Sequence, residues 1–197
     1  MMSSLTEKNI INSICSVAVF CGSRQGNDPA FMKDATALGQ LLAENKIRIV
    51  YGGGGKGLMG AVADAALQAG GHITGIIPKL LTEWEQQHHS LTELLVVDDM
   101  HTRKKMMYEK ADAAIILPGG YGTLDEFFEM LTWNNLNIHN KPIFLLNTHG
   151  YYDHLIAHIL YMQKESFLYE DPFERITVLK GPHDFLTSTA SSLSDKK

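Results

Sequence analysis

The sequence predicts a single-domain α/β protein with a doubly wound, Rossmann-like fold, in which a parallel sheet carries helices on both faces. Short apolar runs alternate with amphipathic stretches of helical length almost throughout the 197 residues. Strands that are separated by such helices need right-handed crossovers, which place them parallel in one sheet. Glycine-rich turns also follow several strands, at the edge where folds of this class bind ligands.

The elements follow one another in a regular order. The expected strands are residues 16–20, 47–51, 73–77, 94–97, 113–117, 143–146 and 176–179. The expected helices are residues 29–44, 58–69, 100–110, 124–136 and 152–164. Residues 79–92 have mixed periodicity and are expected to form a loop with a short helix, large enough to border an active site.

Length and composition limit the classes of protein to consider. We expect one domain at residues 14–186, preceded by flexible residues 1–13 and followed by a disordered, serine-rich tail at residues 187–197. A net charge of −5 makes nucleic acids and anionic membranes unexpected partners. No run of about 18 apolar residues predicts a membrane span. Cys15 and Cys21 lack metal-ligand spacing and suit a reducing compartment, so we expect a cytoplasmic protein.

The first glycine turn, residues 52–57, matches the dinucleotide-binding pattern G-x-G-x-x-G. That pattern requires a carboxylate at the end of the next strand, but residues 76–78 contain none. A phosphate-binding P-loop is excluded because glycine, not serine or threonine, follows Lys56. Two interpretations remain: the glycines only permit a tight turn and close packing, or the backbone at Gly53 and Gly54 lines a nucleotide pocket.

The second glycine turn, residues 118–126 (PGGYGTLDE), follows an apolar strand and opens a helix. Its three glycines leave successive N–H groups unobstructed, and the helix N-terminus favours a phosphate there. Thr123 can add a hydroxyl donor, and Glu126, expected in the first helical turn, would reach a bound ligand. Thr123-x-x-Glu126 is also a capping box, in which the glutamate only satisfies a backbone amide. Asp125 and Glu129 are rival carboxylates that spacing cannot separate from Glu126.

Arg103 lies on an apolar helical face, because Met100, Met106 and Met107 are three or four residues away. An arginine in that position needs a carboxylate or phosphate partner. The alternative is that its aliphatic stem packs while the guanidinium extends to solvent.

These segments together resemble the LONELY GUY (LOG) family of cytokinin-activating phosphoribohydrolases, which were formerly labelled lysine decarboxylases. The family signature PGGxGTxxE corresponds to residues 118–126, the Met-His-x-Arg-Lys segment to residues 100–104, and a GGGxxGLMG-like turn to residues 52–60. The resemblance extends over about residues 16–180. It implies hydrolysis of the N-glycosidic bond of cytokinin or purine riboside 5′-monophosphates to free base and ribose 5-phosphate by a homodimer. We expect no metal or other cofactor, because no cluster of cysteine, histidine and carboxylate side chains has zinc-ligand spacing; His88 and His89 are adjacent and point in different directions on a regular element.

The resemblance makes Arg103 and Glu126 the catalytic pair. Together with the two glycine turns, it implies these substrate-binding positions: Ser23, Gly53, Gly54, Glu85, Met100, Arg103, Lys104, Gly119, Gly120, Tyr121, Gly122, Thr123, Leu124, Asp125, Glu126 and Thr132. Cleavage of the C1′–N bond builds positive charge on the sugar, as in O-glycoside hydrolysis. A carboxylate can stabilise that charge, hold ribose hydroxyls or activate water. Residues 83–89 depart from the usual family loop, so the identity of the base stays open.

Two other functions compete with this interpretation. A non-catalytic nucleotide-binding or regulatory module would use the same phosphate turn. A lysine decarboxylase would need pyridoxal phosphate on a lysine, and neither Lys56 nor Lys104 has a suitable sequence context.

Overall fold

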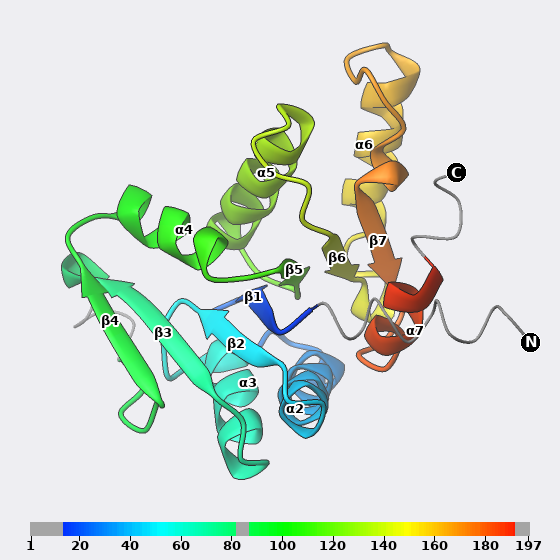
Figure 1. The fold of residues 1–197 in the computed structure, drawn as a ribbon. Helices are drawn as coiled ribbons and strands as arrows, with labels where there is room; N and C mark the ends of the chain where they lie inside the picture. The colour runs from blue at the N-terminus through cyan, green and yellow to red at the C-terminus, as the bar shows by residue number, and fades with distance from the viewer. Residues whose placement is uncertain (1–13, 82–86, 192–197) are drawn as a thin grey trace, which may run out of the picture.

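The computed structural model describes residues 14–81 and 87–191, and within them seven strands form one sheet (Figure 1). The strands are β1 (Ser16–Phe20), β2 (Arg48–Tyr51), β3 (Ile73–Pro78), β4 (Glu93–Val97), β5 (Ala113–Ile116), β6 (Ile143–Leu146) and β7 (Ile176–Leu179). Their order is β4-β3-β2-β1-β5-β6-β7, and every neighbouring pair is parallel. The predicted doubly wound fold is therefore confirmed.

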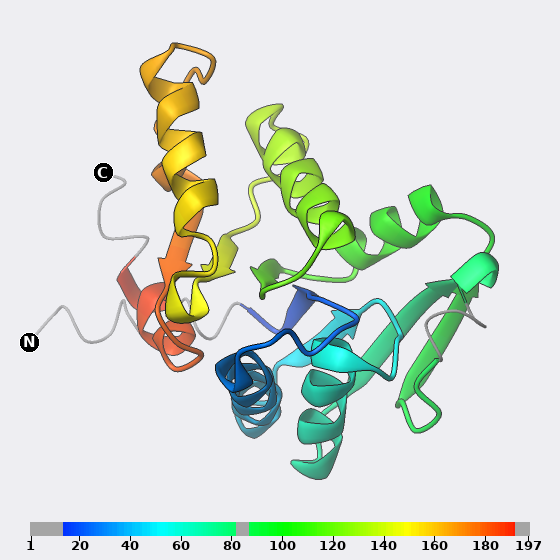
Figure 2. The ribbon, with the colours of Figure 1, turned by 180° about the vertical axis from the view of Figure 1, so that it is seen from behind.

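Helices cover both faces of this sheet. One face carries α2 (Pro29–Glu44), α3 (Gly57–Gln68) and α7 (Asp184–Ser191); the other carries α4 (Met100–Glu109), α5 (Tyr121–Asn135) and α6 (Asp153–Lys164) (Figures 1 and 2). Short 3₁₀ helices lie at η1 (Lys79–Leu81), η2 (Thr148–Gly150) and η3 (Pro172–Glu174). None of the helices in the described ranges is long and apolar enough to cross a membrane.

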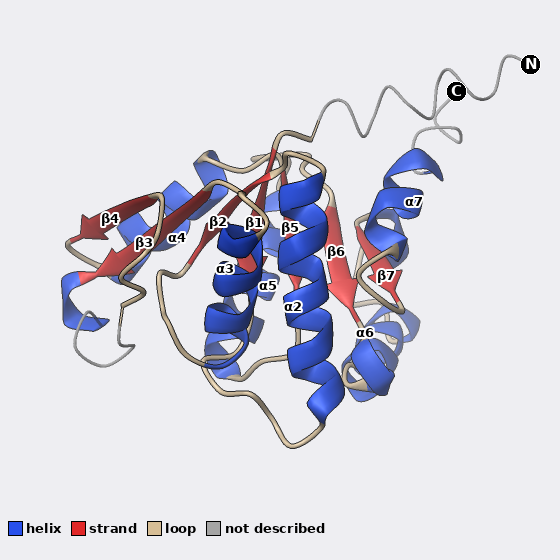
Figure 3. Cartoon of the chain, turned by 90° about the horizontal axis from the view of Figure 1, so that it is seen from below, coloured by secondary structure: helices blue, strands red, loops and turns tan. Residues whose placement is uncertain are grey.

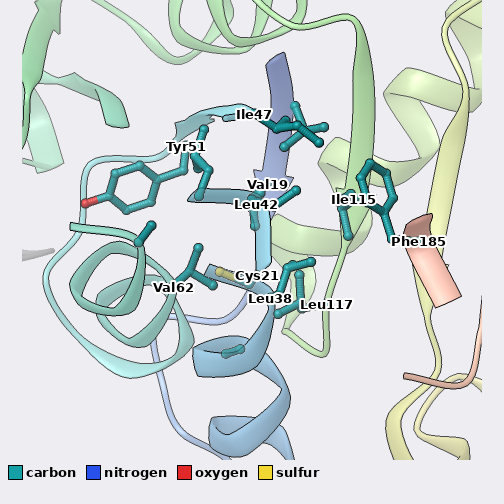
Figure 4. Packing of buried hydrophobic residues seen from close by; sticks show 14 of the residues in the cluster. Val19, Cys21, Leu38, Leu42, Ile47, Tyr51, Val62, Ile115, Leu117 and Phe185 are labelled. Atoms are coloured by element: carbon teal, nitrogen blue, oxygen red, sulfur yellow. The ribbon is translucent and has the colours of Figure 1, made fainter. Parts of the chain in front are cut away.

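The core consists of two apolar layers, one on each side of the sheet. Val17 and Val19 of β1 pack toward α2 and α3, while Ala18 and Phe20 pack toward α4, α5 and α6. Figure 4 shows part of the first layer, to which Val19 of β1, Leu38 and Leu42 of α2 and Val62 of α3 all belong. Because the central strands are buried on both faces, they read as continuous apolar runs rather than alternating ones.

The strand order reverses between β1 and β5. The chain leaves β1 toward α2 on one face and leaves β5 toward α5 on the other. Figure 3 shows α2 and α3 in front of the sheet with α5 behind it. Connections that diverge in this way leave a crevice at the carboxyl ends of the two strands, which is where doubly wound proteins bind ligands.

Two expectations about the elements were wrong. Helix α5 begins at Tyr121, three residues before the predicted start, because glycines conceal a helix start from apolar periodicity. The C-terminal segment forms α7, Asp184–Ser191, where residues 187–191 were expected to be disordered. Phe185 anchors this helix, since its ring lies edge-on to Phe144 with centroids 5.0 Å apart. Residues 1–13 and 192–197, also predicted to be flexible or disordered, lie outside the described residues.

Candidate active site

A cavity of about 630 Å³ opens at the carboxyl ends of β1 and β5. Its walls come from the turn after β1, the start of α3, one face of α4, the second glycine turn with the start of α5, and Tyr151. The predicted site residues that line it are Ser23, Met100, Arg103, Gly119, Gly120, Tyr121, Gly122, Thr123, Asp125 and Glu126. Segments that lie far apart in the sequence thus meet at the carboxyl edge of the sheet, where the sequence predicted ligand binding.

The N-terminus of α5 faces this cavity with its amides unused by the helix. Gly120 is the N-cap residue, and the first intrahelical hydrogen bond runs from Leu124 N–H to Gly120 O at 3.1 Å. The amides of Tyr121, Gly122 and Thr123 therefore have no acceptor within the helix. A Cβ atom built on Gly120 or Gly122 would meet no atom within 4 Å. The space around these amides is open, as an anion site requires.

The glycine at position 119 serves another purpose. A Cβ atom there would collide with the Thr123 hydroxyl and lie 2.9 Å from Gly22 N. Gly119 thus lets the turn pack tightly against the β1 turn and beneath Thr123, whose side chain is buried yet borders the cavity. This packing holds the Thr123 side chain at the wall of the cavity, and the role of its hydroxyl as a phosphate donor stays a prediction.

The capping-box interpretation of Glu126 is wrong. That motif requires the threonine at the N-cap, but the N-cap is Gly120, so Thr123 is the third helical residue and Glu126 the sixth. Glu126 consequently lies in the second turn of α5, not the first as predicted, because the helix begins earlier. Its position one turn beyond the free amides puts the carboxylate on the wall of the cavity.

Lys104 forms ion pairs with two of the three candidate carboxylates of α5. Its ammonium lies 3.1 Å from Asp125 Oδ2 and 2.9 Å from Glu129 Oε2. Partial burial by itself would lower the pKa of Lys104, but the hydrogen bonds to Glu129 and Asp125 outweigh it and raise that pKa above its ordinary value. Asp125 and Glu129 are thus charge-compensated by one lysine. Glu126 is the carboxylate of the three that lines the cavity without an ion pair to Lys104.

Arg103 is only 4% exposed, so its guanidinium does not extend to solvent. Its Nε–H donates to Ile76 O at 3.1 Å, an Nη2–H donates to Gly52 O at 3.2 Å, and an Nη1–H approaches Met100 Sδ at 3.7 Å. The carbonyls belong to the carboxyl ends of β3 and β2. They hold a permanent positive charge at the cavity wall in a set orientation.

The first glycine turn makes room for the side chain of Arg103. A Cβ atom on Gly52 would collide with Arg103 Nη2, so only glycine lets the guanidinium approach the carbonyl. Gly53 has φ +82°, a conformation that favours glycine. Gly53 and Gly54 are buried and absent from the lining of the cavity. The described contacts thus support packing at this turn, and nucleotide contact by Gly53 and Gly54 stays a prediction.

Several other predicted positions also lie away from the cavity. Leu124 and Lys104 are not among its lining residues. Thr132 lines a separate cavity of about 160 Å³ between α5, α6 and η3. Glu85 falls outside the described residues.

The cavity is also lined by residues that were not expected from the sequence, among them Cys21, Arg24, Phe31 and Tyr151. Tyr151 Oη donates to Gly119 O at 2.6 Å, across 32 residues of sequence. The next residue, Tyr152, donates to Leu117 O at 2.6 Å, and burial raises the pKa of its phenol far above the ordinary value. Both follow β6 at the carboxyl edge of the sheet, so that topological rule could have identified them.

The fold and site together define an α/β protein whose cavity, of about 630 Å³, is bordered by the N-terminus of a helix at the carboxyl edge of a parallel sheet. A family model described as possible lysine decarboxylase matches residues 59–189. A cytokinin riboside 5′-monophosphate phosphoribohydrolase of Rhodococcoides fascians is 48% identical over 166 residues, 84% of each chain. The enzyme of that name from Arabidopsis thaliana, LOG7, is 44% identical over 167 residues, 85% of this chain and 76% of the relative. This chain belongs to the LOG family.

A solved structure supports the fold assignment. The molybdenum cofactor binding protein from Rippkaea orientalis superposes with a TM-score of 0.68 over 91% of this chain and 97% of its own. The two sequences are 22% identical, so this likeness concerns the fold alone.

Proposed function

We propose that this protein hydrolyses the N-glycosidic bond of riboside 5′-monophosphates, releasing the free base and ribose 5-phosphate. One observation carries the proposal: open helix N-terminal amides and a carboxylate lie one helical turn apart on the wall of one cavity. From Gly122 to Glu126 the axis of α5 rises about 6 Å. A phosphate bound at the amides therefore places C1′ of its ribose near the Glu126 carboxylate. The names of the relatives agree with this reaction.

In the proposed reaction the amides of residues 120–123, beginning with that of the N-cap Gly120, and the Thr123 hydroxyl hold the 5′-phosphate. As the C1′–N bond breaks, its electron pair leaves with the base, which takes up a proton, and positive charge builds on the ribose. The Glu126 carboxylate stabilises that charge, and water adds to C1′ and loses a proton. Arg103 contributes a fixed cation for the polar groups of the substrate.

The test is incubation of the purified protein with AMP and with isopentenyladenosine monophosphate, followed by chromatography of the free base. Release of base with an equal amount of ribose 5-phosphate supports the proposal. Nucleotide binding without release would instead support a regulatory module. EDTA in a parallel reaction is expected to leave the rate unchanged, and a metal requirement would contradict the proposed mechanism.

A pyridoxal-dependent decarboxylase would need a lysine in the cavity. None of the described lining residues is a lysine, and the ammonium of Lys104 is engaged by two carboxylates. Absorbance of a bound aldehyde cofactor in the purified protein would restore this alternative.

The enzyme is expected to select substrates strongly by their 5′-phosphate. Hydrogen bonds to a charged group contribute about 1.5–3 kcal/mol each. Loss of two would lower kcat/KM by about a hundred- to ten-thousand-fold. Steady-state kinetics with a nucleoside, its 5′-monophosphate and its 5′-triphosphate measure this. Equal kcat/KM for nucleoside and monophosphate would refute the role of the glycine turn.

We also propose that the protein acts as a cytoplasmic homodimer. Large apolar side chains are exposed on α6 and around η3, namely Leu160, Tyr161, Phe167, Tyr169 and Phe173, which supports association. Cys15 and Cys21, the two cysteines of the sequence, are not joined in a disulfide, as is usual in a reducing compartment. Light scattering coupled to gel filtration tests the dimer, and fractionation of cells tests the compartment.

A further inference from the structure

Three consecutive backbone carbonyl groups, at residues 117–119, lie where the chain leads into the second glycine turn, and each accepts a hydrogen bond. Leu117 O accepts from Tyr152 Oη at 2.6 Å, Pro118 O from Gly22 N at 3.0 Å, and Gly119 O from Tyr151 Oη at 2.6 Å. Two of the three donors are phenols from one short connection between β6 and α6. The glycine turn is thus oriented by a segment about 30 residues further along the chain.

The third of these hydrogen bonds holds the peptide group between Gly119 and Gly120, which can rotate more easily than the rest of the turn. In a trans peptide the carbonyl and the following N–H point in opposite directions. By holding Gly119 O, Tyr151 therefore also sets the direction of Gly120 N–H. Glycine on both sides of this peptide bond leaves little steric resistance to its rotation. A rotated peptide would turn a partly negative carbonyl toward the anion in place of an N–H donor.

Tyr151 is itself held firmly enough to orient another group. Its ring lies edge-on to Phe31 of α2, with centroids 5.4 Å apart, and edge-on to Tyr152 at 4.8 Å. The preceding residues are tied to the same side of the molecule. His149 Nδ1 lies 2.8 Å from Asp28 Oδ2, and Thr148 Oγ1 donates to Asp34 Oδ2 at 2.7 Å.

We propose that Tyr151 is a positioning residue for phosphate binding, its hydroxyl holding the peptide bond between Gly119 and Gly120 in the orientation that binds the anion. The inference rests on the proposed function only in naming the anion as the 5′-phosphate of the substrate. Tyr151 also lines the cavity, so its hydroxyl acts at the site and not through the core.

The test is Tyr151→Phe, which removes one oxygen and keeps the ring contacts. Ribose 5-phosphate and inorganic phosphate should bind about three- to ten-fold more weakly by calorimetry, because one hydrogen bond is lost. The KM of the riboside monophosphate should rise, kcat/KM for the unphosphorylated nucleoside should not change, and Tm should stay within error. Tyr108→Phe, which removes a phenol hydroxyl from α4 outside the cavity lining, is the control and should match the wild type.

Unaltered phosphate binding by Tyr151→Phe would overturn the inference, as would an equal loss for phosphorylated and unphosphorylated substrates. The two proposals fail separately. A wild type that binds ribose 5-phosphate but releases no base refutes the proposed function, while weaker binding by the variant still supports the positioning role. Normal hydrolysis by the wild type, together with unaltered phosphate binding by Tyr151→Phe, would support the proposed function and refute the positioning role of Tyr151.

Discussion

Gly119, Gly120 and Gly122 are close neighbours in the sequence, yet an added methyl group would meet different surroundings at each. At Gly119 it collides with Thr123, whereas at Gly120 and Gly122 it enters open space. The first glycine is needed for packing. The other two keep the region in front of the helix amides free, which is a requirement of ligand binding and not of folding.

Gly122→Ala is therefore expected to fold normally and to gain up to about 1 kcal/mol of stability, since alanine favours the helix. Its kcat/KM for riboside monophosphates should fall because the methyl group occupies ligand space. Gly119→Ala should instead lower Tm. Thermal unfolding and steady-state kinetics on both variants measure the contrast; a Gly122→Ala enzyme with wild-type kinetics would contradict it.

Glu126→Gln is expected to lower kcat by about 10²–10⁴-fold, the usual size of a carboxylate's contribution as acid, base or charge stabiliser. Stability should hardly change, because Glu126 takes no part in a capping box. The matched control is Glu129→Gln, which alters a carboxylate paired with Lys104 away from the cavity lining. Similar losses in both variants would remove the special role of Glu126.

At the scale of single elements, α4 illustrates how a buried charge can attach a helix to the sheet. Arg103 reaches from α4 to backbone carbonyls of Ile76 and Gly52. Asp99 caps the start of the same helix by accepting from Thr102 N at 2.8 Å. That backbone hydrogen bond, together with one from the Thr102 hydroxyl, lowers the pKa of Asp99. Asp99 thus determines where α4 begins, and the hydrogen bonds of Arg103 hold the same helix against the sheet.

Arg103→Ala should therefore lose stability as well as activity. Each carbonyl left without a donor costs about 1–3 kcal/mol, so the two together lower the free energy of unfolding by about 2–6 kcal/mol. Urea denaturation measures this, with Lys105→Ala on the exposed face of α4 as a control that should change it little. An Arg103→Ala protein as stable as the wild type would show that solvent replaces the arginine at both carbonyls.

At the scale of the whole molecule, global stability should depend on the protonation of His139, a buried residue between α5 and β6. Its Nδ1 accepts from Lys141 N at 3.1 Å, and its ring lies 4.7 Å from that of Tyr108. Burial and then the charge of Lys141 lower the pKa of His139 below 6.5; the Met130 backbone raises that pKa by less, and the charge of Arg175 lowers it slightly further. The neutral ring is therefore the folded form.

Because the unfolded chain takes up this proton first, His139 contributes its full stability above pH 6.5. The contribution is lost as the pH falls from 6.5 toward the lowered pKa. Denaturation curves across that range should show a smaller pH dependence for His139→Gln than for the wild type. His183→Gln, at an exposed position, should keep the wild-type dependence. Identical slopes for wild type and His139→Gln would contradict the assignment.

The sequence by itself determined the strands and most of the helices, the parallel sheet, the two glycine turns and the family. These features follow from local properties of the sequence. The spacing of apolar residues indicates which side chains are buried, and the glycines of the second turn lie only a few residues from Glu126. Only the tertiary structure showed which carboxylates of α5 pair with Lys104, because Lys104 lies 21 residues from Asp125. It alone showed that Gly52 makes room for Arg103, 51 residues away, and that Tyr151 holds the turn at Gly119. Sequence spacing specifies neighbours on one element, whereas contacts between elements depend on where the crossovers bring the chain.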